Sequence, residues 1–332
     1  MSNKIFSISS AFVLGASFAV ADVPKVAVDI APVHSLVSKV MNGLGKPNLI
    51  IPAEASPHEY QLRPSEAKAL QEAKLVFWIG EDLTPWLEKG LSTLAKDATI
   101  TTLLKADGIE LLDFREGALF EAHDHSDHDD HDDHDDHDDH DHGKHKKKDD
   151  HDDHAGHEGH DHGEHDPHAW LSPGIAKVWL NLIAAKLSEV DPNNASTYFS
   201  NASSASKELD TLSDEINKIL DPIRKEKFVV FHDAYQYFEN HFNISASGAI
   251  SLGDASDPSP ARLKEIKERV EKEDIHCVLA EPQYNEGLVK AVIEGTHANN
   301  AVIDPLGFSL EIGPNLYDKL IRNLAINLSN CF

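Results

Sequence analysis

A long polar segment that cannot be buried in a hydrophobic core interrupts the 332-residue chain. Residues 123–166 contain fifteen His, nineteen Asp and Glu, and four Lys, with no apolar periodicity. Such a composition buries too little apolar surface to offset the entropy lost on folding. We therefore expect 117–166 to be a disordered insertion in a surface loop of the metal-free protein, a position where folds tolerate added length. The fold must be built from the residues on either side.

The residues flanking this insertion alternate between strand-sized apolar runs and amphipathic helices. Before it, KVAVDIAPVHSLVSKVM predicts a strand and a helix, NLIIPA a strand, and Ser65 the start of a helix that leads into the strand LVFWIG. After it, FVVF, CVLAEP and AVIDPL predict three more strands, each followed by a helix. This alternation is typical of an α/β fold with parallel sheets. We expect two such lobes, at 22–170 and 225–332.

A helical region at 171–224 separates the two predicted lobes. Ser172 and Pro173 are residue types preferred at a helix N-cap and at the first helical position, and Pro192 interrupts the helix that they begin. Over 195–219, leucines and isoleucines recur along one helical face. A helix of that length can join two lobes or pack along one of them.

The N-terminus has the features of a secretory signal peptide. Lys4 precedes an apolar run that is too short to span a bilayer, and Ala19-Val20-Ala21 provides the small residues of a cleavage site. We expect residues 1–21 to be removed on export, with a buried helix or a membrane anchor as the alternatives. No Cys follows the run, so a lipid anchor has no acceptor.

The two cysteines, Cys277 and Cys331, predict one disulfide. In an exported protein an even, low cysteine count indicates a disulfide, and two buried thiols are the alternative. The bond would tie the C-terminus to the predicted strand CVLA and would contribute on the order of 4 kcal/mol to stability.

Seven His lie outside the insertion, and three of them share a context. His58 follows the apolar run LIIPA, His168 precedes the helix that begins at Pro173, and His232 ends the strand FVVF. Open α/β folds bind ligands at the carboxyl ends of strands, so residues from two lobes can meet in the cleft between them. A lone His at the end of an element is more often structural. We expect His34 to be structural or to lie behind the ligands, and His241, His276 and His297 to be surface residues.

Several motifs, taken in order, resemble a known family. They are SPHEYQLRPSEAKALQEAKLVFWIG, DPHAWLSPGIAKVW, FVVFHDAYQYFE, CVLAEPQ and IDPLG. Together they look like the zinc-binding subunit of bacterial zinc ABC importers, the ZnuA-type proteins among the metal-binding solute-binding proteins. The resemblance covers nearly the whole mature chain and includes the acidic insertion and both cysteines. It implies a periplasmic α/β protein of two lobes joined by a long helix, with the metal in the inter-lobe cleft.

The resemblance also implies a set of metal ligands. One His from each of three motifs binds the metal in that family, and the matching residues here are His58, His168 and His232. Asp304 occupies the position of a fourth ligand in some relatives; others use water or a Glu before the first His, where this chain has Pro57. Three imidazoles and one oxygen suit tetrahedral Zn²⁺, whereas manganese-binding relatives replace the third His with a carboxylate. We expect zinc, although imidazole also binds Cu and Ni.

The function implied is capture of Zn²⁺ and its delivery to the membrane permease of an ABC importer, by a monomer that is not an enzyme. The net charge of -27 leaves no basic face for nucleic acid. The acidic insertion would attract cations at long range and act as an accessory zinc collector or sensor, with a solvated loop of no function as the alternative. Its candidate ligands are His123, His125, His128, His131, His134, His137, His140, His142, His145, His151, His154, His157, His160, His162 and His165.

Two other functions compete with this one. A zinc hydrolase would keep an open metal position and a general base, but the chain has no H-E-x-x-H motif, and Glu59 is the candidate base beside a predicted ligand. A metal buffer built on the insertion predicts that deletion of residues 123–165 abolishes tight binding. An importer subunit predicts that one tight site survives this deletion, and its long connecting helix predicts a small closure on binding.

Overall fold

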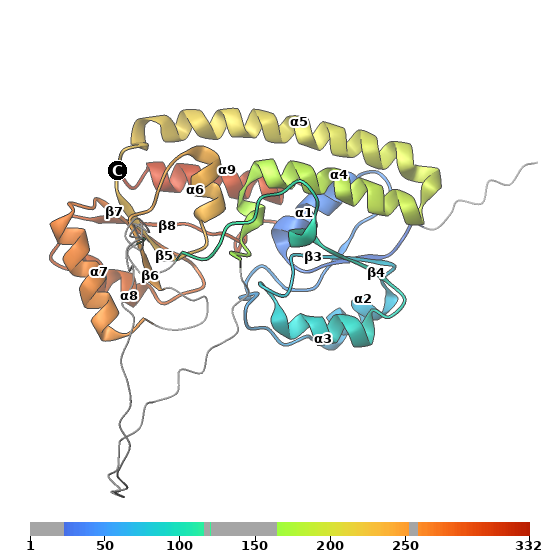
Figure 1. Ribbon diagram of the computed structural model, residues 1–332, viewed down its shortest axis with the longest axis horizontal. Coiled ribbons are helices and arrows are strands. Elements are labelled where there is room, and N and C mark those ends of the chain that lie inside the picture. The colour runs from blue at the N-terminus through green and yellow to red at the C-terminus, as the bar shows by residue number, and fades with distance from the viewer. Residues whose placement is uncertain (1–22, 116–119, 121–164, 252–257) are drawn as a thin grey trace, which may run out of the picture.

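The chain is arranged as two α/β lobes beneath a layer of long helices (Figure 1). The structure is a computed structural model that describes residues 23–115, 120, 165–251 and 258–332. The predicted signal peptide and most of the predicted insertion lie outside these residues. Within the described ranges, no helix combines the length and the apolar character that a membrane span requires.

The first sheet has the strand order β2-β1-β3-β4, and all neighbouring strands run parallel. Its strands are β1 (Val26–Val28), β2 (Asn48–Leu49), β3 (Leu75–Trp78) and β4 (Thr99–Thr102). The helices between them are α1 (Ala31–Val40), α2 (Pro64–Glu72) and α3 (Pro85–Leu94). Every residue of β1 and β3 is buried, as expected for the centre of a parallel sheet that is covered on both faces.

The second sheet repeats this topology with the order β6-β5-β7-β8, again entirely parallel. Its strands are β5 (Phe228–His232), β6 (Ala249–Ser251), β7 (Cys277–Ala280) and β8 (Asn299–Val302). The helices of this lobe are α6 (Gln236–Phe242), α7 (Pro260–Lys272) and α8 (Glu286–Ile293). Central strands β5 and β7 are completely buried, and the apolar runs FVVF and CVLA supply most of their residues.

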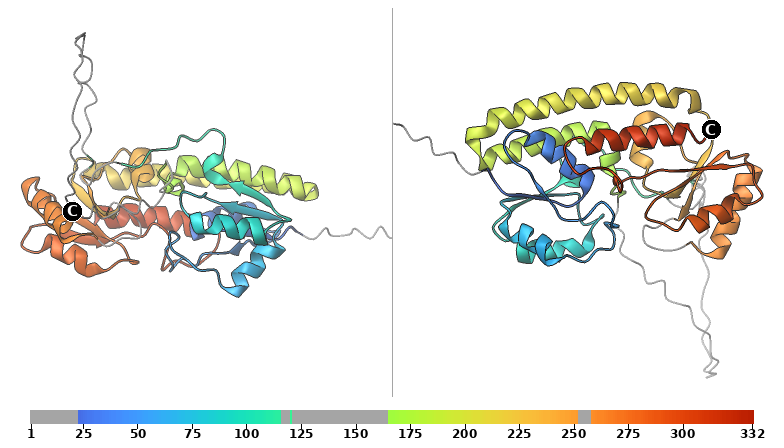
Figure 2. Two further views of the ribbon diagram at one scale, coloured as in Figure 1. Left: turned by 60° about the horizontal axis from the view of Figure 1, so that its bottom comes forward. Right: turned by 180° about the vertical axis from the view of Figure 1, so that it is seen from behind.

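Three helices join the lobes: α4 (Pro173–Val190), α5 (Ala195–Leu220) and α9 (Leu316–Ser329). The Ser172 hydroxyl accepts the Ile175 amide and caps α4, and a short 3₁₀ turn at Pro192–Asn194 leads into α5. Helix α5 has 26 residues and passes over both sheets, and α9 lies alongside it (Figures 1 and 2). These features confirm the predicted α/β class with two parallel sheets and a long joining helix.

One apolar core runs through both lobes. It includes residues of β1, α1 and β3 in the first lobe, of α4, α5 and α9 in the helical layer, and of β5 and β7 in the second lobe. Trp170 and Tyr317 join its parts, because the Tyr317 hydroxyl donates to the Trp170 carbonyl at 2.8 Å. A smaller second cluster lies between the second sheet and helices α7 and α8.

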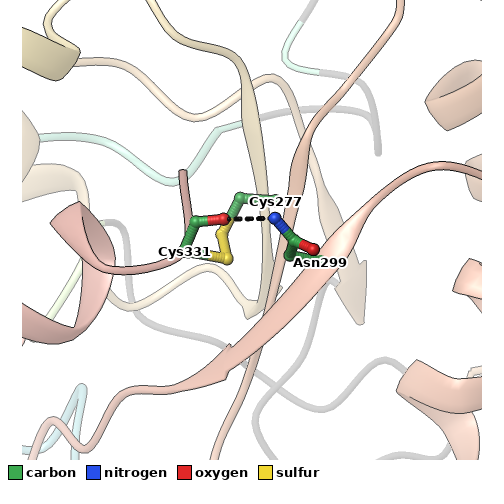
Figure 3. Close-up of a disulfide and its surroundings, with 3 residues drawn as sticks. All are labelled: Cys277, Asn299 and Cys331. Atoms are coloured by element: carbon green, nitrogen blue, oxygen red, sulfur yellow. Dashed lines mark hydrogen bonds between the residues drawn. A yellow bond between two sulfur atoms is a disulfide. The ribbon is translucent and has the colours of Figure 1, made fainter.

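Cys277 and Cys331 form the predicted disulfide (Figure 3). The bond joins the first residue of β7 to the chain just beyond α9. Beside it, the Asn299 amide on β8 donates to the Cys331 carbonyl at 2.8 Å. The C-terminus is therefore tied to two neighbouring strands of the second sheet.

Candidate metal site

Three His rings from separate parts of the chain line one pocket. His58 lies in the loop between β2 and α2, His168 precedes the 3₁₀ turn Ala169–Leu171, and His232 is the last residue of β5. The His168 ring centroid lies 5.6 Å from that of His58 and 5.4 Å from that of His232. The pocket has about 20 Å³ of free volume, which is enough for a single ion or water molecule.

A buried carboxylate orients His168. Asp166 Oδ1 lies 2.7 Å from His168 Nδ1 and also accepts the His168 amide at 2.9 Å. Both residues are buried, so this contact is shielded from water. A carboxylate at Nδ1 favours the tautomer with its proton on that nitrogen, which makes Nε2 the metal-binding nitrogen of the ring.

The same arrangement occurs at His232. Glu281 Oε1 lies 2.6 Å from His232 Nδ1, and both side chains are almost fully buried. Glu281 directly follows β7, which pairs with β5, so the parallel register brings the two residues to the same edge of the sheet. Glu281 also lines the pocket, and its buried Oε2 has no hydrogen-bond partner among the described residues.

His58 is positioned by the loop that carries it. The Trp86 indole on α3 donates to the Pro57 carbonyl at 2.8 Å, and the His58 amide donates to the Ser56 hydroxyl at 3.3 Å. The ring is partly exposed, unlike those of His168 and His232. Glu59, the candidate base of a hydrolase, is exposed and is not among the residues that line the pocket.

The structure does not bring Asp304 into the pocket. Its Oδ1 accepts the amides of Leu306 and Gly307 at 3.0 and 2.9 Å, and its Oδ2 accepts the Phe308 amide at 2.5 Å. Asp304 therefore stabilises the turn after β8, and Pro305 and Leu306 line the pocket instead. No three His, Cys, Asp or Glu side chains of the described residues form a ready-made metal site. The three imidazole rings lie close together, but they do not surround a single metal-binding point.

Sequence reasoning missed the two orienting carboxylates, although it singled out the segments that carry them. Asp166 belongs to DPHAW and Glu281 to CVLAEP. A carboxylate at the end of the strand beside β5 is a signal that could have identified Glu281. The contact of Asp166 with a ring two residues away depends on the local turn, which the sequence does not specify.

The remaining His residues divide between buried and exposed positions. His34 is structural, as predicted: it is buried, with Nε2 3.2 Å from the Pro47 carbonyl. His276 and His297 are exposed, also as predicted. The prediction for His241 is wrong, because its ring is half-buried between Ser172 and Ser213, each 3.4 Å away. Packing of α6 against α5 and the start of α4 produces this contact.

Of the accessory set, the structure describes His165 alone. Its Nδ1 lies 2.9 Å from an Asp113 carboxylate oxygen, and the two residues form an isolated antiparallel bridge. The other fourteen His of the insertion lie outside the described residues.

Comparisons with known proteins identify the family of the chain. The family of periplasmic zinc-uptake complex component A, ZnuA, matches residues 26–331. The chain belongs to the ZnuA family. High-affinity zinc uptake system protein ZnuA of Brucella abortus is 46% identical over 92% of this chain and 91% of its own length. ZnuA of Paracoccus denitrificans is 45% identical over 94% of this chain and 92% of its own length.

Solved structures show the same fold. A crystal structure of ZnuA superposes with a TM-score of 0.71 at 22% identity, over 93% of this chain and 99% of that one. The solute-binding protein FpvC of Pseudomonas aeruginosa, in complex with Mn²⁺, also has a TM-score of 0.71, at 17% identity over 93% of this chain and 97% of that one. The family match confirms the resemblance noted in the sequence. Members of the ZnuA family are binding proteins and not enzymes, which argues against the hydrolase.

Proposed function

We propose that this member of the ZnuA family binds Zn²⁺ with high affinity in the periplasm and delivers it to the permease of an ABC importer. The observation that carries the proposal is the pocket itself. Three imidazoles from three segments line a space of ionic size, and buried carboxylates hold two of them by Nδ1. Imidazole nitrogens are preferred ligands of Zn²⁺.

We propose His58, His168 and His232 as the zinc ligands. The carboxylates of Asp166 and Glu281 fix the orientation of two rings and make them better electron donors. Both carboxylates are buried, so their two negative charges would balance the two positive charges of Zn²⁺ where water does not screen them. A neutral imidazole binds the ion, so zinc uptake should release protons wherever a ring is protonated beforehand.

Asp304 remains the predicted fourth ligand, and its recruitment has a structural cost. Both of its oxygens accept backbone amides, so binding zinc would break at least part of that network. A water molecule could complete a tetrahedral site without this rearrangement. Zinc titration of Asp304→Asn separates the two cases: a water-completed site predicts an affinity close to that of the wild type.

The proposal also covers the domain boundaries and the segments that the structure does not describe. Residues 1–21 act as a cleaved signal peptide, and the mature chain divides into lobes at 22–170 and 225–332 with the helical region 171–224 between them. The His-rich insertion collects or senses zinc for the cleft site, and the protein works as a monomer.

Zinc titration by competition calorimetry tests the site. It would be run on the mature chain, on a version lacking residues 123–165, and on that shortened version with His58, His168 and His232 changed singly to Ala. His297→Ala is the matched control, because this His is exposed and lies outside the pocket. We expect one tight site to survive the deletion and the control, and to be lost in each of the three variants.

Two results would contradict the proposal. Loss of all tight binding with the deletion would make the insertion a metal buffer and the main site. Survival of tight binding in all three Ala variants would place the zinc site elsewhere in the molecule.

A further inference from the structure

A loop from the first lobe crosses to the second beside the pocket. It follows β4 and reaches α6, where the Leu112 amide donates to the Tyr237 hydroxyl at 3.0 Å. Three residues later, the Arg115 guanidinium lies between Asp233 and Glu239. The loop therefore joins the lobes by an ionic contact, in addition to the apolar core behind the pocket.

The Arg115 contact is bidentate to one acid and reaches the second acid through two nitrogens. Arg115 Nε lies 3.0 Å from both Asp233 oxygens, while Nη1 and Nη2 lie 2.8 and 3.0 Å from the two Glu239 oxygens. The three side chains are 16%, 9% and 4% exposed, so water screens them weakly. A planar guanidinium suits this geometry, which a single ammonium group cannot reproduce.

Each end of this contact leads to a proposed zinc ligand. On one side, Asp233 directly follows His232 at the end of β5. On the other, the Leu112 carbonyl accepts the Asp166 amide at 2.8 Å, and the Asp166 carboxylate holds His168. Arg115 thus lies three residues after Leu112, whose carbonyl is hydrogen-bonded to the segment of His168. It also forms an ion pair with Asp233, the residue that follows His232.

We propose that Arg115 is a positioning residue for zinc binding, which holds the segments of His168 and His232 at their 5.4 Å ring spacing before the ion arrives. This inference rests on the proposed function, because it takes both rings as zinc ligands. Removing the guanidinium leaves two acids buried side by side without a cation, so the segment after His232 must rearrange.

The test compares Arg115→Gln and Arg115→Lys with the wild type, using zinc and cobalt as the probe ions. Zinc affinity would be measured by competition titration, and the geometry of the site by the visible absorption of bound Co²⁺. We expect Arg115→Gln to lower zinc affinity by about 10–100-fold, the range found when groups that orient metal ligands are removed, and to change the Co²⁺ spectrum. Arg115→Lys should recover part of the affinity, because it keeps the charge and loses the bidentate contact.

Lys39→Gln is the matched control. Lys39 is 7% exposed and also lies between two acids, Glu208 and Asp318, at 2.6 and 3.0 Å. These residues belong to α1, α5 and α9 and do not line the pocket. The variant should lose stability while keeping the zinc affinity and the Co²⁺ spectrum of the wild type. If Arg115→Gln does not fold, the two single variants Glu239→Gln and Arg115→Lys provide the same comparison.

The outcomes separate this inference from the proposed function. Wild-type affinity and spectrum in the Arg115 variants, or an equal fall in the Lys39 control, would overturn the positioning role while leaving the zinc site intact. Failure of the proposed function would show instead in chains that keep Arg115. There, His168→Ala and His232→Ala would still bind zinc tightly.

Discussion

Removal of the disulfide should destabilise the protein by an amount that the loop length sets. Cys277 and Cys331 are separated by 54 positions, and closing a loop of that size in the unfolded chain corresponds to about 4 kcal/mol in the chain-entropy model. The double variant Cys277→Ala/Cys331→Ala should lose roughly that free energy of unfolding. Because the cross-link also compacts the unfolded chain, the variant should show a steeper dependence on denaturant.

Urea unfolding followed by circular dichroism measures both quantities. Asn299→Ala is the control, since it removes the hydrogen bond beside the disulfide and should cost about 1 kcal/mol without changing the slope. Zinc affinity of the double variant should stay unchanged, because Cys277 begins β7 whereas Glu281 follows its other end. A loss below about 1 kcal/mol in the double variant would refute the entropic reasoning.

Three other results are expected. Glu281→Gln should weaken zinc binding by roughly 10–100-fold, and unchanged affinity would show that this carboxylate does not orient His232. Burial raises the pKa of Asp29 to about 7 from 3.8, so the folded state holds this proton more tightly than the unfolded state. Wild-type stability relative to Asp29→Asn should therefore fall by about 3 kcal/mol as the pH rises from 4 to 7, and a pH-independent difference in urea unfolding would contradict this. Small-angle scattering with and without zinc should show a small change in shape, because α5 and α9 join both lobes; a large lobe rotation would contradict it.

The fold could be predicted because its signals are local. Strands such as β3 and β5 are buried on both faces and are read as continuous apolar runs, and Pro173 marks the start of α4. The disulfide could be predicted from the even number of cysteines and from the N-terminal segment that indicates export. The grouping of the three His in one pocket could be predicted because each lies in a motif that the family resemblance could match.

The groups around the His could not be predicted in the same way. Arg115 is a lone charge in a loop, and nothing in its surroundings reveals two acidic partners more than a hundred positions away. Asp304 follows an apolar run, as a ligand at the end of a strand would, yet its carboxylate accepts the amides of the turn it begins. Such roles depend on which segments meet in space, and sequence periodicity carries no information about that.

The continuous core has a consequence for how the protein loses its structure. Helix α9 starts against α1 and is covalently attached to β7 beyond its end, so the apolar surfaces of both lobes are completed by the same helices. Neither lobe can melt alone without exposing the buried face of α5 to water. Calorimetry should therefore record one cooperative transition, with equal calorimetric and van't Hoff enthalpies, where two independent lobes would give two. A carrier built in this way can give up its ion through small displacements of loops and side chains while its scaffold stays a single thermodynamic unit.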